Sequence, residues 1–142
     1  MQTLTLDVAN HMIAAALATG ADLMLKPLCV VVLDAGGHLV AMQRQDGASM
    51  LRPEIAMGKA FGALAMGAGS RALATAAVER PHFFQGLSGV SAGRIVPVPG
   101  GVLVRAAGGT ILGAVGISGD TSDNDETCAV AGIEAAGFSA EP

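Results

Sequence analysis

The stretch Gly113-Ala-Val-Gly-Ile-Ser-Gly119, followed at once by Asp120-Thr-Ser-Asp-Asn-Asp-Glu126, decides how this chain folds. Its first half is a run of small and apolar residues that is typical of a buried strand. Its second half is rich in side chains that cap helices, and Ser122 is the expected N-cap of a helix over residues 122–136. Gly137 ends that helix. Glycine in the strand permits close approach of a helix, so we expect these glycines to serve packing.

Working outward, the remaining patterns extend this strand into a sheet. Strands are predicted over residues 28–34, 38–45, 94–98, 102–106 and 110–118. Helices are predicted from about residue 6 to the Lys26-Pro27 break, over 54–66 and over 70–80 with Ser70 as cap, with a short helical turn over 82–87. Short glycine turns between the strands demand antiparallel pairing. The sequence therefore predicts an α+β fold, a single antiparallel sheet of about five strands flanked by helices, in one domain spanning residues 1–142.

Composition excludes several classes of function. Of the 142 residues, 51% are hydrophobic and 14% charged, and a small protein with so little charge is expected to bury further surface in a homo-oligomer. A net charge of −4, four Phe and no Tyr or Trp argue against nucleic-acid binding. No apolar run is long enough to span a bilayer and no signal peptide is visible, so we expect a cytoplasmic protein without a membrane partner. Two lone cysteines are expected to be reduced, buried thiols.

Two further motifs precede the small-residue strand, Val32-Leu-Asp-Ala-Gly-Gly-His-Leu-Val40 and Ile55-Ala-Met-Gly-Lys-Ala60. In this order the three motifs resemble the GlcG/HbpS family, which is also the C-terminal domain type of PduO-like proteins, over nearly the whole chain. The resemblance implies a profilin-like or PAS-like sheet with flanking helices. It also implies a small-molecule ligand, because several members bind haem, some at a protomer surface or subunit junction, in haem sensing or degradation. PduO-type relatives are linked to corrinoid metabolism. This sequence lacks the export signal and the Glu-x-x-Glu iron-binding pattern of the secreted members.

Lys59 is an isolated charge on an apolar helix face. It is the only charged residue between Glu54 and Arg71, and neither of these is three or four residues away. Such an ammonium must find a tertiary partner, extend to solvent, or lose its proton. Two interpretations stay open for it, extension to solvent at an interface and binding of an anion or substrate in a pocket. Asp125 fits a Ser122-x-x-Asp125 capping box, and its carboxylate is also a candidate partner for Lys59.

The histidines are the candidate iron ligands and proton-transfer groups. His82 follows the helix break at Pro81 and precedes Phe83 and Phe84, the only adjacent aromatic pair, so it is the first choice for either role. His11, on the polar arc of the first helix, is the second choice. The alternatives are a loop histidine packed by its Phe neighbours for His82 and simple exposure for His11. No two histidines have i, i+4 spacing and no HExxH or CxxC motif occurs, so no zinc site is predicted.

Two functions stay open at this point. The first is a small-ligand-binding protein of the GlcG/HbpS type whose cofactor is haem or a related tetrapyrrole, with His82 as metal ligand and His11, Phe83 and Lys59 as further contacts. The second is a small catabolic enzyme, an isomerase, lyase or hydrolase acting on a small organic acid, since GlcG-type relatives occur with organic-acid degradation. In that case Lys59 binds the substrate carboxylate and His82 or Asp125 moves the proton. Soret absorbance after addition of haem separates the two.

Overall fold

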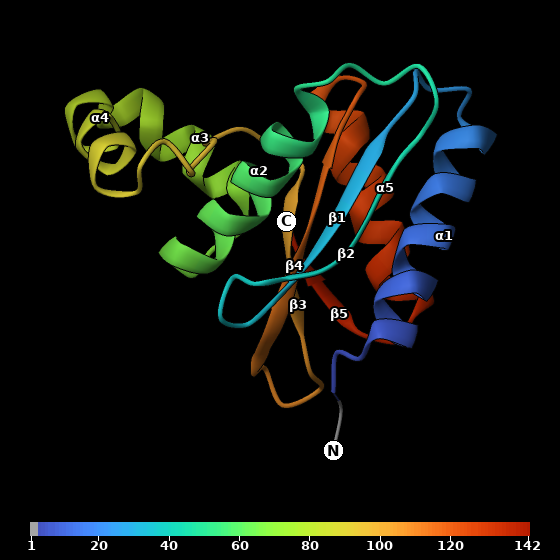
Figure 1. Ribbon diagram of the computed structural model, residues 1–142. Coiled ribbons are helices and arrows are strands. Elements are labelled where there is room, and N and C mark those ends of the chain that lie inside the picture. Colours follow the sequence, from blue (N-terminus) through green and yellow to red (C-terminus); the bar gives the residue numbers. More distant parts are fainter. Residues whose placement is uncertain (1–2) are drawn as a thin grey trace.

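In a computed structural model, which describes residues 3–142, the apolar runs form one open antiparallel sheet with helices on both faces (Figure 1). The strands are β1 (Cys29–Asp34), β2 (Leu39–Arg44), β3 (Gly101–Arg105), β4 (Ile111–Ser118) and β5 (Ser139–Glu141), in the order β2-β1-β4-β3-β5. The helices are α1 (Leu6–Asp22), α2 (Arg52–Met66), α3 (Ser70–Glu79), α4 (Pro81–Val90) and α5 (Ser122–Ala135). The predicted α+β fold with a single antiparallel sheet is confirmed.

Both faces of the central strands β1, β3 and β4 are largely buried, which explains why these strands are apolar without alternation. On one face, Val30 and Val32 of β1 pack in the core cluster formed with α1 and α5. On the other face, Val31 and Leu33 pack in a second cluster beneath α2. Helices α3 and α4 continue from α2; α3 meets β3 at its first residue, and α4 lies away from the sheet, on the left in Figure 1.

Glycines in neighbouring strands let α2 lie directly on the sheet backbone. Gly101 of β3 and Gly116 of β4 are opposite each other in the antiparallel register. A β-carbon at Gly116 would lie 2.0 Å from the carbonyl oxygen of Ala56 in α2, and one at Gly101 would lie 2.2 Å from that of Lys59. Close helix packing is therefore the role of both glycines, as the sequence predicts for Gly116, whereas Gly101 belongs to a strand and not to the expected turn.

The strand predicted over residues 94–98 is wrong, because that segment is irregular. Pro97 and Pro99 have no N–H to donate to a ladder, and the N–H of Val96 instead donates to the carbonyl of Gly58 in α2 at 3.1 Å. The fifth strand is instead β5, which pairs with β3. It was not predicted, because three residues are too short to show a strand pattern. The short turn predicted over residues 82–87 is the ten-residue helix α4.

The two predicted serine caps are also corrected. The N-cap of α5 is Thr121, whose hydroxyl accepts from the N–H of Asn124 at 3.2 Å, so Ser122 is already the first helical residue. In α3 the N-cap position is Gly69, and the hydroxyl of Ser70 turns away to accept the N–H of Gly101 at 2.7 Å. The cap of α5 thus lies one residue before its predicted position, and strand β3 takes the hydroxyl of Ser70 that was expected to cap α3.

Candidate functional site

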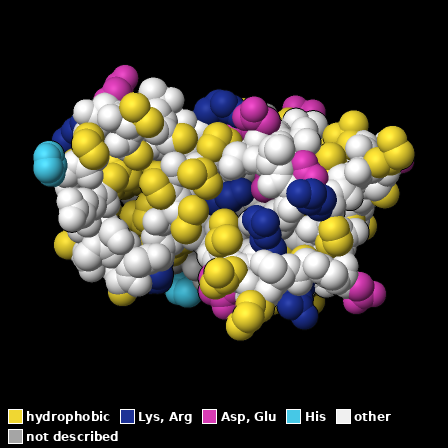
Figure 2. All heavy atoms as spheres, turned by 90° about the horizontal axis from the view of Figure 1, so that it is seen from above, with side chains coloured by type: hydrophobic (Ala, Val, Ile, Leu, Met, Phe, Trp, Pro, Cys, Tyr) yellow, Lys and Arg dark blue, Asp and Glu magenta, His cyan; other side chains and the backbone are white. Residues whose placement is uncertain are grey.

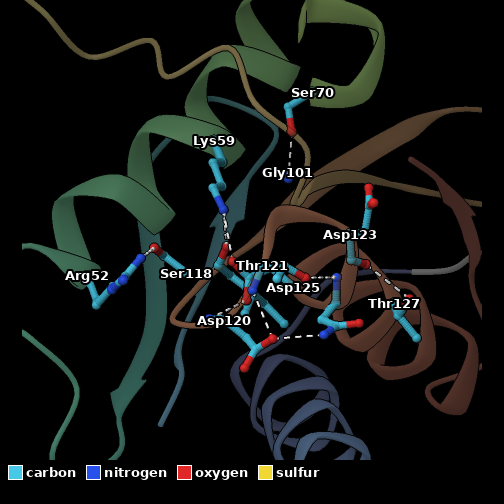
Figure 3. Close-up of polar contacts among 12 residues, drawn as sticks. Arg52, Lys59, Ser70, Gly101, Ser118, Asp120, Thr121, Asp123, Asp125 and Thr127 are labelled. Carbon is cyan, nitrogen blue, oxygen red and sulfur yellow. Dashed lines mark hydrogen bonds and ion pairs between the residues drawn. The ribbon is translucent and has the colours of Figure 1, made fainter. Parts of the chain in front are cut away.

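A buried ion pair joins α2 to the beginning of α5 (Figure 3). The Lys59 ammonium donates to Asp125 Oδ2 at 3.1 Å and to the carbonyl of Ile117, at the end of β4, at 2.9 Å. The Lys59 and Asp125 side chains are 3% and 1% exposed. The other carboxylate oxygen of Asp125 accepts the N–H of Asp120 at 3.0 Å, which closes the turn between β4 and α5. Because Asp125 points inward to these groups, it does not form the predicted capping box with Ser122.

Burial decides the electrostatics of this pair. Desolvation lowers the pKa of Lys59 below its ordinary value, while the charge and the hydrogen bond of Asp125 oppose that shift. The charge of Arg52 lowers the pKa of Lys59 further. The enclosed ammonium already has two acceptors, so the geometry gives Lys59 a structural partner rather than an open face toward a ligand.

Two residues beside the pair were missed from the sequence. Asp120 lies in the turn and accepts from the Asn124 side chain at 2.8 Å and from the backbone N–H groups of Lys26 and Thr121. These bonds, the Asn124 bond first, lower the pKa of the Asp120 carboxyl to about 2. Arg52, at the start of α2, donates to the buried hydroxyl of Ser118 at 3.0 Å. Asp120 could have been predicted as a turn residue from the polar cluster that follows β4. No sequence pattern predicts the contact between Arg52 and Ser118.

His82 lies on α4, apart from the buried pair. It is the second residue of that helix and is exposed. Phe83 is 40% exposed, meets Phe84 edge to face with ring centroids 5.7 Å apart, and carries the Arg80 guanidinium 4.3 Å above its ring. No residue of α4 is buried. The structure thus brings Lys59 and Asp125 together but does not bring His82 to them, so the three groups named for acid–base catalysis do not share one site.

His11 lies on α1 beside a shallow depression of about 380 Å³, also lined by Asp7, Val8, Ala135 and Ala136. Its Nε2 atom is 3.2 Å from the carbonyl oxygen of Ala135. The third histidine, His38, is exposed, and its Nδ1 atom is 3.2 Å from Asp34. Within residues 3–142 there is no group of three or more His, Cys, Asp or Glu side chains that could hold a metal ion.

No single helix in the described part of the chain is long and apolar enough to cross a membrane. Two consecutive helices, Arg52–Met66 and Ser70–Glu79, are together long and apolar enough, by length and composition alone, but they are bent by 80° where they meet. Cys29 and Cys128 are free and buried, as expected for structural thiols.

The fold and its motifs match known proteins. Residues 4–134 match the family described as haem degrading protein HbpS-like. An uncharacterised 15.0 kDa protein from the dhaT-dhaS intergenic region of Citrobacter freundii is 33% identical over 132 residues, 93% of this chain and 91% of that protein. The crystal structure of a PduOC:heme complex superposes with a TM-score of 0.87 at 25% identity, covering 99% of this chain and 100% of that one. The Klebsiella pneumoniae protein ORFY superposes with a TM-score of 0.85 at 29% identity, covering 96% and 92%. This chain therefore belongs to the HbpS-like family, as its three sequence motifs predict.

Proposed function

We propose that this protein binds haem or a related tetrapyrrole on α4, with His82 as the axial ligand of the iron. The family is described by haem degradation, and a similar structure is a complex with haem, which supports this ligand class. The observation that carries the proposal is an exposed histidine followed on the same helix face by two open glycines. The neutral imidazole of histidine is a common axial ligand, and haem bound through it supplies redox-active iron.

The surface of α4 fits a flat, largely apolar ligand. His82, Gly86 and Gly89 have i, i+4, i+7 spacing and so share one face. No heavy atom lies within 4 Å of a β-carbon built on Gly86 or Gly89, so a ring can approach the helix backbone there. Phe83 borders this face with an exposed aromatic ring, and the Arg80 guanidinium stacked on it is a cation suited to a propionate.

His11 is the second candidate because it lies beside a depression. Its Nε2 atom already has the carbonyl of Ala135 within hydrogen-bond distance, whereas His82 has no such partner within residues 3–142. Ligation through Nε2 of His11 requires that this contact be lost. The free imidazole supports His82 as the ligand, in the order that the sequence predicts.

Haemin titration followed at the Soret band tests the proposal. His82→Ala is expected to shift or abolish the bound spectrum, and His11→Ala to leave it unchanged. Gly86→Leu fills the open face and is expected to weaken binding about tenfold or more, since about 1.4 kcal/mol of lost contact has that effect. Ser88→Leu, on the opposite side of α4, is the matched control. A spectrum that survives His82→Ala and is lost with His11→Ala assigns the iron to α1 and refutes the role of α4.

Formation of a homo-oligomer remains a prediction, and the exposed surface of α4 is a candidate for the contact between copies. None of the ten residues of α4 is buried, and Val90 is 83% exposed, so this surface is available to a second copy as well as to haem. Light scattering on the samples used for the titration measures the homo-oligomer that the composition predicts. A monomer in both the free and the haem-bound sample would contradict it.

A further inference from the structure

A cavity of about 440 Å³ lies between α2, the end of β1 and the turn after α4, and no residue of α4 itself lines it. Its volume is within the range of about 300–1,000 Å³ typical of small-molecule sites. Leu33, Met57 and Phe61 line it with apolar surface, and Glu54 and Arg94 add one charge of each sign. Hydrophobic side chains gather over α2–α4, on the left of the face seen in Figure 2.

The Arg94 side chain is held in place by its surroundings. Its Nε atom donates to the carbonyl of Ser91 at 2.7 Å, and its guanidinium carbon lies 4.4 Å from the centroid of the Phe61 ring. Ala92, which also lines the cavity, has φ 56, a left-handed conformation that is uncommon for a residue other than glycine and often marks a functional site. The two terminal guanidinium nitrogens have no hydrogen-bond partner in the described part of the chain. A fixed cationic fork is therefore available at this cavity.

Glu54 supplies the complementary charge. It lies in the first turn of α2, lines the same cavity, and forms no ion pair with Arg94 or with any other cation among residues 3–142. Both side chains are exposed to solvent, and two opposite charges that line one apolar cavity without pairing suit a ligand that carries both charges itself. An arginine fork suits a carboxylate, and a glutamate suits an ammonium.

We propose that this cavity binds a small zwitterion with an apolar body, namely an α-amino acid with an aliphatic side chain. Its carboxylate binds Arg94, its ammonium binds Glu54, and its side chain packs on Leu33 and Met57. The site is independent of tetrapyrrole binding, because it shares no residue with the face formed by His82, Gly86 and Gly89.

Three probes of nearly equal shape test this assignment by isothermal titration calorimetry. L-leucine carries both charges, isocaproate lacks the ammonium, and isoamylamine lacks the carboxylate. Leucine is expected to bind with a saturable isotherm at millimolar concentrations or below, and each analogue at least about tenfold more weakly, because each loses one charge-assisted contact. Absence of saturable leucine binding overturns the proposal. Isocaproate binding as tightly as leucine overturns the zwitterion assignment and the role of Glu54.

Charge-neutral variants assign the two contacts. Arg94→Gln is expected to weaken leucine binding at least about tenfold and to abolish the preference for leucine over isoamylamine. Glu54→Gln is expected to abolish the preference for leucine over isocaproate. Arg44→Gln removes an exposed arginine outside the cavity and Glu79→Gln removes an exposed carboxylate, so both controls are expected to bind like the original protein. Unchanged binding by Arg94→Gln with an unchanged melting temperature refutes the site.

Discussion

Replacing Lys59 by Met tests whether the buried pair holds α2 to the start of α5. Methionine keeps most of the apolar stem of lysine but removes the ammonium. Asp125, 1% exposed, then keeps only the N–H of Asp120 as a donor to its carboxylate, and the carbonyl of Ile117 loses the ammonium as a partner. The variant therefore contains a buried negative charge without a counter-charge.

The magnitude follows from that uncompensated charge. Breaking a buried ion pair by removing one partner costs about 3–5 kcal/mol of unfolding free energy. With an unfolding entropy of about 2.1 cal/mol/K per residue, this loss lowers the melting temperature of the 142-residue chain by about 10–17 °C. An exposed pair costs far less, about 0–1 kcal/mol.

Urea unfolding at neutral pH measures these free energies. Arg71→Met, which breaks the exposed contacts of Arg71 with Glu126 and Asp123, is the matched control and is expected to cost less than about 1 kcal/mol. The double variant Lys59→Met/Asp125→Leu removes both buried charges and is expected to be more stable than Lys59→Met alone. A loss below about 1 kcal/mol for Lys59→Met, the size of the control, would refute the reasoning.

The pH dependence of the same variant has a definite sign. Because the pKa of Lys59 in the folded protein is below 10.5, the unfolded chain holds that proton more strongly between the two pKa values. The free energy of unfolding of the original protein therefore rises with pH between the lowered pKa and 10.5, in addition to what the ion pair contributes at neutral pH. Relative to the original protein, Lys59→Met is expected to lose this alkaline rise.

Two further predictions concern packing and thiols. Gly116→Ala is expected to cost at least about 1–3 kcal/mol in urea unfolding, because its β-carbon would lie 2.0 Å from the Ala56 carbonyl oxygen, whereas Gly108→Ala, in open space, is expected to cost little. Burial raises the pKa of Cys29 and of Cys128 from 9.0 to about 11, so each thiol's contribution is present below pH 9.0 and is lost as the pH rises through about 11. Above pH 9.0 the free energy of unfolding is therefore expected to fall by up to about 3 kcal/mol per thiol, and replacing both cysteines by Ala should remove this fall. An equal fall in the variant without the cysteines would contradict the prediction.

The sequence predicts those parts of the fold that local patterns specify. The β1–β2 hairpin followed from two strand-like runs on either side of Gly36-Gly37. The strand predicted over residues 94–98 failed because β-branched residues outweighed the missing donors of the alternating prolines. Strand β5 carries no pattern of its own and depends on pairing with β3.

The same difference between local patterns and tertiary contacts decides which parts of the candidate sites could be predicted. An isolated lysine with no partner one helical turn away indicates that a tertiary counter-charge must exist, and Asp125 could be named as its candidate. The stacking of Arg94 on Phe61 could not be named, because it depends on how the turn after α4 lies against α2. A cavity formed by three separate elements has no signature in any one of them.

The segment that decides the fold serves the fold rather than a ligand. Its carboxylates at Asp120 and Asp125 are satisfied by backbone and side-chain donors from within the protein, and the ammonium of Lys59 is enclosed with them. The His82 imidazole and the terminal nitrogens of Arg94, by contrast, have no hydrogen-bond partner within residues 3–142, and both residues lie between α3 and β3 in the sequence. Changes between residues 80 and 94 can therefore alter a ligand site without disturbing the core. This segment, and not the motifs that identify the family, therefore holds the two proposed ligand contacts His82 and Arg94.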